Sequence, residues 1–489
     1  EKLAEFLKSK ATLAAKMAVC RQLRLIGTSA SVPVLGGMLL EPQTSDMARY
    51  ALEKITEISA EKALVEGLSK SKGKIRIGIV SSLGARRAQA SVLLLERLIY
   101  DSDYRTAAAA VAALGQVVNP EAASSLSRAL DKTKGQLQSQ VASSLLKCAE
   151  EYQAKDDLKT AAGIYSKLLS SKLLLPIRKA AMEGVIASSG NDSRKLIIDV
   201  LKSKEKDLHE PAIDMIEEVF DESSIQEICL LLPDLPSESQ VQLLPVLSHY
   251  RNDTALAAVS EATKSKEGMV RIAALASLEN LGNASTVELL AWHGAKGDAE
   301  EQKAARNSLW RLSGSDIDQA ILLNLIKSPD PDIQNELILS IGERRVYAGQ
   351  SLLFDKARSS NSKTCILAIR ALKEVASPSD IPRLVELLLN ARNETEEEEI
   401  GNTIAATAGK ISWPALPADA IKAILPSIED TKGRCTLYRV LGKIGDDGSL
   451  PLLRRALAEG NAEIYNASVR ALADWPTITP RDDLLQVAR

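Results

Sequence analysis

The chain has 489 residues, of which 45% are hydrophobic and 26% charged, but only 3% are aromatic. Enzyme cores usually draw on Phe, Tyr and Trp for bulk, so we expect a core of Leu, Ile, Val and Ala packed between helices. The chain has a formal net charge of −3, so it is not basic overall as nucleic-acid-binding proteins usually are. No stretch reaches the roughly 18 uncharged apolar residues of a membrane-spanning helix, so we expect no membrane insertion.

The main signal is one apolar anchor position that returns about every 31 residues from end to end. The anchors are Leu23, Leu52, Leu83, Leu114, Leu145, Val185, Ile216, Leu247, Leu278, Leu309, Ile341, Leu372, Ala408, Leu441 and Leu472. Around each anchor, a first amphipathic segment is followed by a short polar link and a second, Ala-rich segment. One such helix pair cannot bury its apolar stripe alone. The pattern therefore predicts an all-α fold, an α-solenoid (superhelix) of about fifteen stacked helix pairs.

The second segments end at or near a glycine in several units, at Gly27, Gly115, Gly282, Gly314 and Gly445. Glycine adopts the left-handed conformation that commonly ends a helix, and we expect Gly282 to do so.

The first half of the chain divides at an irregular spacing of the anchors. Residues 1–150 are predicted to be regular repeats that form a basic N-terminal part, with 21 Lys and Arg against 14 Asp and Glu. The interval from Leu145 to Val185 is longer by nine residues than the common interval. We therefore predict a longer, TPR-like or HEAT-like hairpin over residues 151–190, centred on 152–169.

Regular repeats are predicted again over residues 191–390, followed by a break and further repeats over 391–489. The break contains a charge run, Glu394 and Glu396 to Glu399, which is typical of a solvated helix start. It also contains Trp413-Pro414-Ala415-Leu416-Pro417, which cannot be helical throughout. No flexible linker is evident, so we expect one continuous array. The chain starts at Glu1 and ends within what resembles another opening helix, so we expect a fragment truncated at the C-terminus.

Residues suited to catalysis or metal binding are scarce. The three histidines, His209, His249 and His293, fall in different repeats, and a solenoid brings only neighbouring repeats together. The five cysteines are single and lie in apolar contexts, which favours a buried structural role. We predict no catalytic residue, no cofactor and no metal site in this segment.

A Gly-x-Arg-Arg motif closes two second helices, at Gly84 to Arg87 and at Gly342 to Arg345, and Arg251 occupies the same phase as Arg87. Arginines at this position can bond the free carbonyls at a helix end, which is one interpretation. The other is an edge that binds an anionic ligand or an acidic partner. This edge would comprise Lys70, Lys72, Lys74, Arg76, Arg86, Arg87, Arg251, Arg344 and Arg345.

Two tryptophans of one repeat, Trp292 and Trp310, are candidates for an aromatic wall that contacts a partner. The alternative is that they fill space between helices. Trp475 favours that alternative, because it lies three residues after the anchor Leu472.

Segments such as Val270-Arg271-Ile272-Ala273-Ala274-Leu275 and Ala368-Ile369-Arg370-Ala371-Leu372 resemble HEAT repeats of the PBS-lyase type. Tyr438 to Gly445, followed by Val469 to Pro476 with its Ala-Asp-Trp-Pro ending, is similar to large exported bacterial HEAT-repeat proteins. Those proteins often carry a C-terminal jelly-roll domain of the 3-keto-disaccharide hydrolase type, and no part of it is present here. The resemblance implies a periplasmic or secreted location, with the cytoplasm as the alternative.

We expect a non-catalytic scaffold whose concave face, lined by the second helices, grips a protein partner or an appended catalytic domain of the same chain. The alternatives are a HEAT-like enzyme that acts on a ligand or nucleic acid, as glycosylases and bilin lyases do, or hydrolase activity residing in a missing C-terminal domain.

Overall fold

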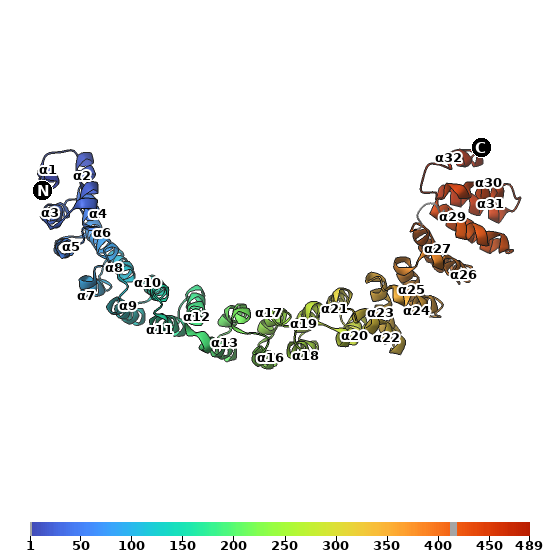
Figure 1. Cartoon of the computed structure of the whole chain (residues 1–489), viewed down its shortest axis with the longest axis horizontal. Helices are drawn as coiled ribbons and strands as arrows, with labels where there is room; N and C mark the ends of the chain where they lie inside the picture. The colour runs from blue at the N-terminus through green and yellow to red at the C-terminus, as the bar shows by residue number, and fades with distance from the viewer. Residues whose placement is uncertain (1, 411–417) are drawn as a thin grey trace. The chain divides into compact units, whose positions relative to one another are not determined.

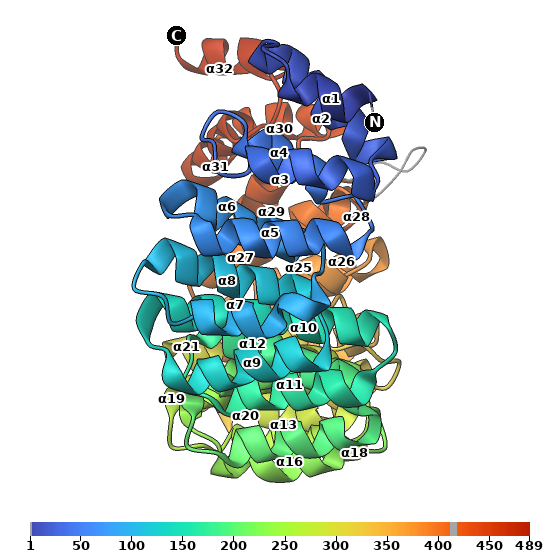
Figure 2. The ribbon, with the colours of Figure 1, turned by 90° about the vertical axis from the view of Figure 1, so that its left-hand side faces the viewer.

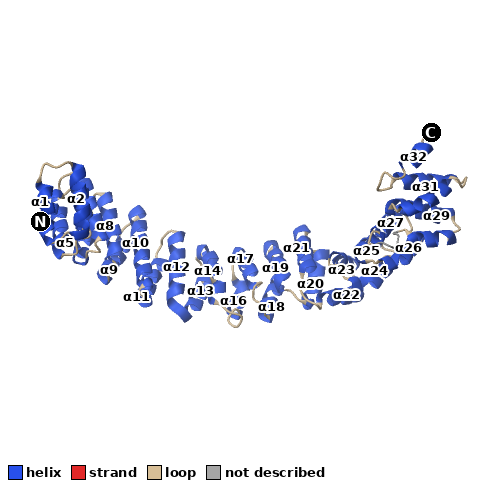
Figure 3. Cartoon of the chain, turned by 45° about the horizontal axis from the view of Figure 1, so that its top comes forward, coloured by secondary structure: helices blue, strands red, loops and turns tan. Residues whose placement is uncertain are grey.

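The computed structural model describes residues 2–410 and 418–489. The predicted connection from Trp413 to Pro417 lies outside the described residues. Every regular element in these two ranges is a helix, and neither range contains a strand (Figure 3). The all-α prediction is therefore confirmed.

Contacts between residues divide the chain into two compact units, Glu1–Phe220 (unit 1) and Asp221–Arg489 (unit 2). The division falls inside the segment 191–390 that was predicted to be uniform. Within each unit the helices pair in chain order, and each pair packs against the next (Figure 1).

Seven helix pairs are described in unit 1. Its first helices are α1 (Lys2–Lys8), α3 (Val32–Met38), α5 (Ile58–Lys70), α7 (Val92–Leu98), α9 (Pro120–Lys132), α11 (Leu158–Ser170) and α13 (Ser193–Lys202). Its second helices are α2 (Leu13–Ile26), α4 (Ser45–Leu52), α6 (Gly73–Ala85), α8 (Tyr104–Val117), α10 (Gly135–Ala154), α12 (Leu175–Ser189) and the divided helix α14 (His209–Asp214) with α15 (Ile216–Val219). In Figure 2, the first helices α3, α5, α7, α9 and α11 run across the view one below another.

Unit 2 contains eight described helix pairs, and α32 (Arg481–Val487) follows them. Its first helices are α16 (Gln226–Leu231), α18 (Asp253–Ala262), α20 (Val287–Lys296), α22 (Ile317–Lys327), α24 (Gln350–Lys356), α26 (Ile381–Leu389), α28 (Asp419–Ile424) and α30 (Leu450–Leu457). Its second helices are α17 (Ser237–Leu247), α19 (Gly268–Leu281), α21 (Ala299–Arg311), α23 (Pro331–Glu343), α25 (Ser362–Val375), α27 (Glu394–Ala408), α29 (Thr431–Ile444) and α31 (Ala462–Ala473).

Short 3-10 helices flank many of these elements. They are η1 (Ser29–Ser31), η2 (Gln89–Ser91), η3 (Gly190–Asp192), η4 (Lys206–Leu208), η5 (Leu232–Asp234), η6 (Ala284–Thr286), η7 (Tyr347–Gly349), η8 (Pro378–Asp380), η9 (Leu425–Ser427) and η10 (Asp447–Ser449).

The fifteen predicted anchors form the spine of the core. Each lies in a different second helix, and each is buried, with the largest exposed fraction, 7%, at Val185. The predicted number of helix pairs is confirmed, because seven pairs in unit 1 and eight in unit 2 are described. Apolar side chains thus form a continuous row in each unit, and each pair is stabilised by its neighbours.

Glycines let successive second helices approach closely. A Cβ on Gly84 would lie 2.6 Å from the Cα of Ala113, and one on Gly342 would lie 3.1 Å from the Cα of Ala371. Gly115 meets Ser144 in the same way, and Gly442 meets Ala471. In all four pairs the partner is 29 residues further along the chain, so the backbone contact repeats with the repeat itself.

The expectation of a left-handed glycine at the end of α19 is wrong. Gly282 has φ −62° and extended backbone, as Gly27 has after α2, whereas Gly445 after α29 is left-handed with φ 68°. Space explains the glycine at position 282, because a Cβ there would lie 2.6 Å from both the Leu278 carbonyl oxygen and Leu312 Cδ2. Gly115 lies inside α8, which ends instead at the left-handed Val118.

The longer interval before Val185 is explained mainly by one helix. α10 has 20 residues and continues through Tyr152 to Ala154, so the predicted hairpin segment 152–169 begins inside it. α11 and α12 then pack against each other as an ordinary pair of 13 and 15 residues.

Candidate functional site

Polar side chains join neighbouring second helices in unit 2. Arg271 bonds Glu301 and Arg306 bonds Glu336, each 30 residues ahead, and Arg370 bonds Glu399, 29 residues ahead. Two residues 29 or 30 apart occupy facing positions on successive second helices. The same spacing therefore produces a ladder of charged pairs along this face.

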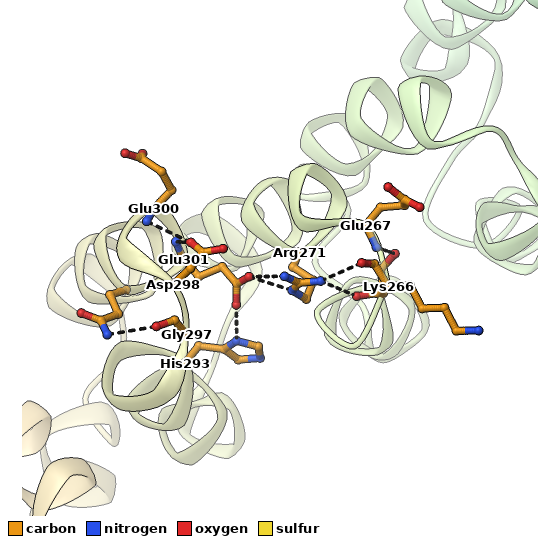
Figure 4. Close-up of polar contacts among 10 residues, drawn as sticks. Lys266, Glu267, Arg271, His293, Gly297, Asp298, Glu300 and Glu301 are labelled. Atoms are coloured by element: carbon orange, nitrogen blue, oxygen red, sulfur yellow. Dashed lines mark hydrogen bonds and ion pairs between the residues drawn. The ribbon is translucent and has the colours of Figure 1, made fainter.

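Glu301 in α21 lies at the centre of the best connected of these clusters (Figure 4). Its carboxylate is only 4% exposed. Arg271 donates from Nε to Glu301 Oε1 over 2.8 Å and from Nη1 to the carbonyls of Ser265 and Lys266 over 2.9 and 3.0 Å. On the other side, Glu301 Oε2 lies 3.5 Å from His293 Nδ1. A buried carboxylate held by a cation in this way stabilises one arrangement of α19, α20 and α21.

Burial of the His293 ring lowers its pKa, and this effect outweighs the opposite pull of Glu301. An imidazole packed between helices in this way fits a structural role. His209 is likewise buried, with Nε2 3.1 Å from the Ser203 carbonyl oxygen, whereas His249 is exposed.

The Gly-x-Arg-Arg motif places its first arginine over a helix end, as the capping interpretation requires. The capped helix, however, belongs to the preceding repeat. Arg344 Nη1 donates to the carbonyls of Leu309, Trp310 and Leu312 at the end of α21, over 3.3, 3.0 and 2.8 Å.

Arg86 likewise bonds the carbonyls of Leu52 and Ile55 at the end of α4. Lys410, a third member that the sequence did not reveal, bonds the carbonyls of Lys373, Glu374 and Ala376 at the end of α25. A cation from one repeat therefore neutralises the negative helix end of the repeat before it.

The other predicted residues of the cationic edge divide between the two units. In unit 1, Arg76 pairs with Asp101 at 3.0 Å, Arg87 with Glu151 at 3.1 Å, and Lys70 with Glu66 at 2.6 Å. Lys72 and Lys74 are exposed and have no ion pair within the described ranges.

In unit 2, Arg345 is 3.8 Å from Glu374, and the backbone nitrogen of Arg251 bonds Glu222 over 3.1 Å. Arg251 also lines an open depression of about 460 Å³ together with Glu279 and Arg311. The residues predicted for the cationic edge are therefore divided between the two units.

The two candidate tryptophans are not brought into ring contact in the described structure. Trp292 in α20 is 49% exposed and meets His293 edge-on, with ring centroids 4.8 Å apart. Trp310 in α21 is half-buried. Trp475 is buried, in agreement with its proposed packing role.

A groove runs over the second helices α27, α29 and α31 of unit 2. It consists of two adjoining open depressions of about 290 and 490 Å³. Both are lined by Glu394, Glu397, Thr436, Arg439 and Arg470. We call these five residues, with Glu398, Lys443, Glu463, Asn466 and Asp474 around them, the α27–α31 groove.

Charges of both signs face the α27–α31 groove without full internal pairing. Glu397 pairs with Lys432 at 3.2 Å and Lys443 bonds Asn402 over 2.6 Å. Arg439 and Arg470, by contrast, form no ion pair with any described residue, and the buried Nε of Arg439 has no hydrogen-bond partner there. Both guanidinium groups can therefore bind an external acceptor.

The sequence suggested that the acidic run at the start of α27 is solvated. In the structure, part of this run is buried. Glu396 is 3% exposed and pairs with Arg392 at 2.9 Å, and Asn393 caps the helix by accepting from the Glu396 backbone nitrogen. Glu399 pairs with Arg370 and Glu397 with Lys432. Glu394 and Glu398 are therefore the groove-lining members of the run that form no ion pair within the described ranges.

Sequence reasoning did not select Arg439 or Arg470, although a signal was present. Arg271, Arg306 and Arg370 each have a glutamate 29 or 30 residues ahead, whereas Ser468 and Val469 occupy those positions for Arg439. A second-helix arginine without its acidic partner marks a charge that the array itself does not neutralise.

Cysteine and metal chemistry have no site in the described ranges. All five thiols are free and buried, and desolvation raises the pKa of Cys20 to about 11 and that of Cys148 to about 12. Burial of this kind favours the protonated thiol and fits a structural role. No group of three metal-ligating side chains occurs among the described residues, and no described helix could span a bilayer.

Two segments of the chain, residues 61–146 and 319–405, match the family model described as HEAT repeats. The first segment lies in unit 1 and the second in unit 2, so both units are α-solenoids that contain HEAT repeats.

Solved karyopherin structures are similar to the chain at low identity. Kap95p, in a study of its binding to RanGDP, shares 11% identity over 97% of this chain and 76% of its own, with a TM-score of 0.36. Kap95 in the Kap95:Nup1 complex shares 10% over 99% and 78%, with a TM-score of 0.36. Kap121p bound to Nup53p shares 11% over 96% and 74%, again with 0.36. No curated protein matches the sequence.

Proposed function

We propose that this protein is a non-catalytic scaffold that binds a protein partner through the second helices of unit 2, at the α27–α31 groove. The observation that carries the proposal is the unpaired state of Arg439, which has Ser468 and Val469 in place of a glutamate at the facing positions of the next repeat. The arginine at the equivalent position of α25, Arg370, which like Arg439 lies two residues before its anchor, is neutralised by Glu399 of the next repeat. Arg439 and Arg470 are available to a partner that supplies carboxylates.

The mixture of charges favours a polypeptide over a nucleic acid. Glu394, Glu397 and Glu398 lie in the same groove as the two arginines and would repel phosphates. A polypeptide can place acidic groups at the arginines and basic or amide groups at the glutamates. Stacked second helices also offer an extended surface, which suits a protein segment better than a small ligand.

The proposal is tested by affinity purification with the 489-residue chain. The double variant Arg439→Glu, Arg470→Glu reverses the two unpaired charges. The control is Arg358→Glu, Arg455→Glu, which reverses one charge in the turn after the first helix α24 and one on the first helix α30 of the same unit. We expect a partner that is recovered by the unaltered chain and the control but lost with the groove variant. Recovery of the same proteins by both variants would refute the proposed site.

Arg251, Arg345 and Trp292 keep exposed side chains in unit 2 and remain proposed secondary contacts with the same partner. The predicted residues Lys72 and Lys74, which have no ion pair within the described ranges, lie in unit 1 and are not part of this groove.

The extracytoplasmic location and the appended C-terminal catalytic domain are part of this proposal. Their support is the resemblance of the segments Tyr438 to Gly445 and Val469 to Pro476 to exported bacterial HEAT-repeat proteins. Cell fractionation of the native protein tests the location, and recovery in the cytoplasm would refute it. Mass determination of the native polypeptide tests the appended domain.

A further inference from the structure

The turns between first and second helices of unit 1 form one edge, which we call the turn edge. Ion pairs connect consecutive turns. Arg76, at the start of α6, pairs with Asp101 of the next turn at 3.0 Å, and Lys167 of α11 pairs with Asp131 of α9 at 2.8 Å. The helices of unit 1 run across the view in Figure 2, so the turns that join them lie at the two sides of the ribbon in that view.

Turns of alternate repeats carry the same basic tripeptide. They follow the first helices of the first, third, fifth and seventh pairs of unit 1 and are Lys8-Ser9-Lys10, Lys70-Ser71-Lys72, Lys132-Thr133-Lys134 and Lys202-Ser203-Lys204. The lysines are exposed, whereas Ser71 and Thr133 are buried and bond carbonyls of the helix they end. The hydroxyl finishes the helix and the two lysines point to solvent.

Turns of the intervening repeats present apolar side chains. Leu40 in the second repeat is 38% exposed, Tyr100 in the fourth is 49% exposed, and Leu174 in the sixth is 65% exposed. Basic and apolar tips therefore alternate along the turn edge.

Helix stability does not account for these residues. Lys72, Lys134 and Leu174 occupy the N-cap positions of α6, α10 and α12, where none forms a side-chain cap bond. N-caps favour Ser, Thr, Asp or Asn, and a cation there opposes the helix dipole. In unit 2 the same position is capped by the side chains of Asp298, Asp330, Asn361, Asn393, Asp430 and Asn461.

The turn edge also keeps its positive charge, because several of its acidic residues are already neutralised. Asp101 pairs with Arg76, Asp131 with Lys167 and Glu205 with Arg178. Lys10, Lys72, Lys134 and Lys204 form no ion pair within the described ranges. Unit 1 as a whole has 32 Lys and Arg against 26 Asp and Glu, whereas unit 2 has 29 against 38.

We propose that the turn edge of unit 1 docks on the surface of an anionic lipid bilayer. Lysines attract anionic headgroups, and apolar tips between them enter the interfacial region. A nucleic acid or a purely acidic polypeptide would satisfy the lysines but would leave Leu174 without an apolar contact. This contact is independent of the α27–α31 groove and needs no membrane-spanning helix.

The test is cosedimentation of the full chain with vesicles of phosphatidylcholine alone and of phosphatidylcholine mixed with phosphatidylserine. We expect binding to the mixed vesicles only, with affinity that falls as salt rises. The combined variant Lys10→Ser, Lys72→Ser, Lys134→Ser, Lys204→Ser should lose about 100-fold or more of this affinity. Serine can cap a helix at the N-cap positions 72 and 134, and positions 10 and 204 are exposed and outside the helices, so loss of folding does not explain the result.

A matched control removes the same charge from unit 1 away from the edge, by Lys54→Ser, Lys62→Ser, Lys147→Ser and Lys155→Ser, and should retain binding within about threefold. Leu174→Ser, which leaves the charge unchanged, should weaken binding several-fold. The proposal is overturned by absence of binding to mixed vesicles, by equal loss in the control, or by unchanged binding of Leu174→Ser. Lysine-dependent binding of duplex DNA or polyglutamate without vesicle binding would assign the edge to that partner instead.

Discussion

A methyl group on Gly84 of α6 would lie 2.6 Å from the Cα of Ala113 in α8, so these two helices touch backbone to backbone. Gly→Ala inside a helix ordinarily stabilises it by about 1 kcal/mol. At Gly84 we expect the reverse, a loss of about 1 to 3 kcal/mol in the free energy of unfolding, because the helices must separate.

Gly163 is the matched control, since it lies within α11 of the same unit and a Cβ there meets no atom within 4 Å. Gly163→Ala should gain stability in the same urea titration. Similar effects of the two substitutions would contradict the close packing of second helices.

Arg344 should stabilise a repeat to which it does not belong. Arg344→Met keeps the apolar stem but removes the bonds to three carbonyls at the end of α21 and to Asp318, so we expect a loss of about 2 to 3 kcal/mol. Arg345→Met, at a side chain that is 67% exposed, should change stability by less than about 0.5 kcal/mol. Hydrogen exchange should show faster exchange at the end of α21 only in the first variant.

His293 should make stability depend on pH. Burial lowers the pKa of the folded imidazole below its ordinary value near 6.5, so the unfolded chain binds the proton more readily. Stability is therefore full above that value and falls as the pH drops below it.

In His293→Gln, the decrease in melting temperature between about pH 7 and pH 5 should be smaller than in the unaltered chain. Parallel melting curves for His293→Gln and the unaltered chain would exclude this role.

N-cap substitutions on the turn edge should raise stability. Lys72→Ser or Lys134→Ser supplies a capping hydroxyl to α6 or α10 and should add about 1 kcal/mol. The reciprocal Asn361→Lys removes the bond from the Thr364 backbone nitrogen and should lose a similar amount. Thermal unfolding checks both, and a loss of stability in Lys72→Ser would mean that the lysine serves the fold.

The periodicity of the sequence predicted the repeat architecture because each anchor has the same local task. A residue such as Leu278 is fully buried, and any apolar side chain of suitable size meets that requirement, so the residue type at an anchor can be recognised from the local sequence. Contacts that cross repeats were harder to predict. Arg344 and its capped carbonyls are about 34 residues apart, and the local motif indicated only that a helix end was near.

The candidate groove was missed for a related reason. Arg439 looks like the other second-helix arginines until the facing position, Ser468, is known to hold no carboxylate. Glu396 was misjudged for the same reason. Its local sequence indicates a solvated helix start, but Arg392 and Asn393 bond its carboxylate in a buried position. The two predicted tryptophans share a repeat but lie on different helices, and no ring contact joins them in the described structure.

The most direct measurement of the proposed function is photo-crosslinking from opposite faces of one repeat. A crosslinking residue is placed at Asn466 of α31, which lines the groove, or at Arg455 of α30, which is exposed on the first helix of the same pair. The account predicts a discrete protein adduct from position 466, absent from position 455 and abolished by Arg439→Glu with Arg470→Glu. An equal adduct from both positions, or one that survives the charge reversal, would contradict it.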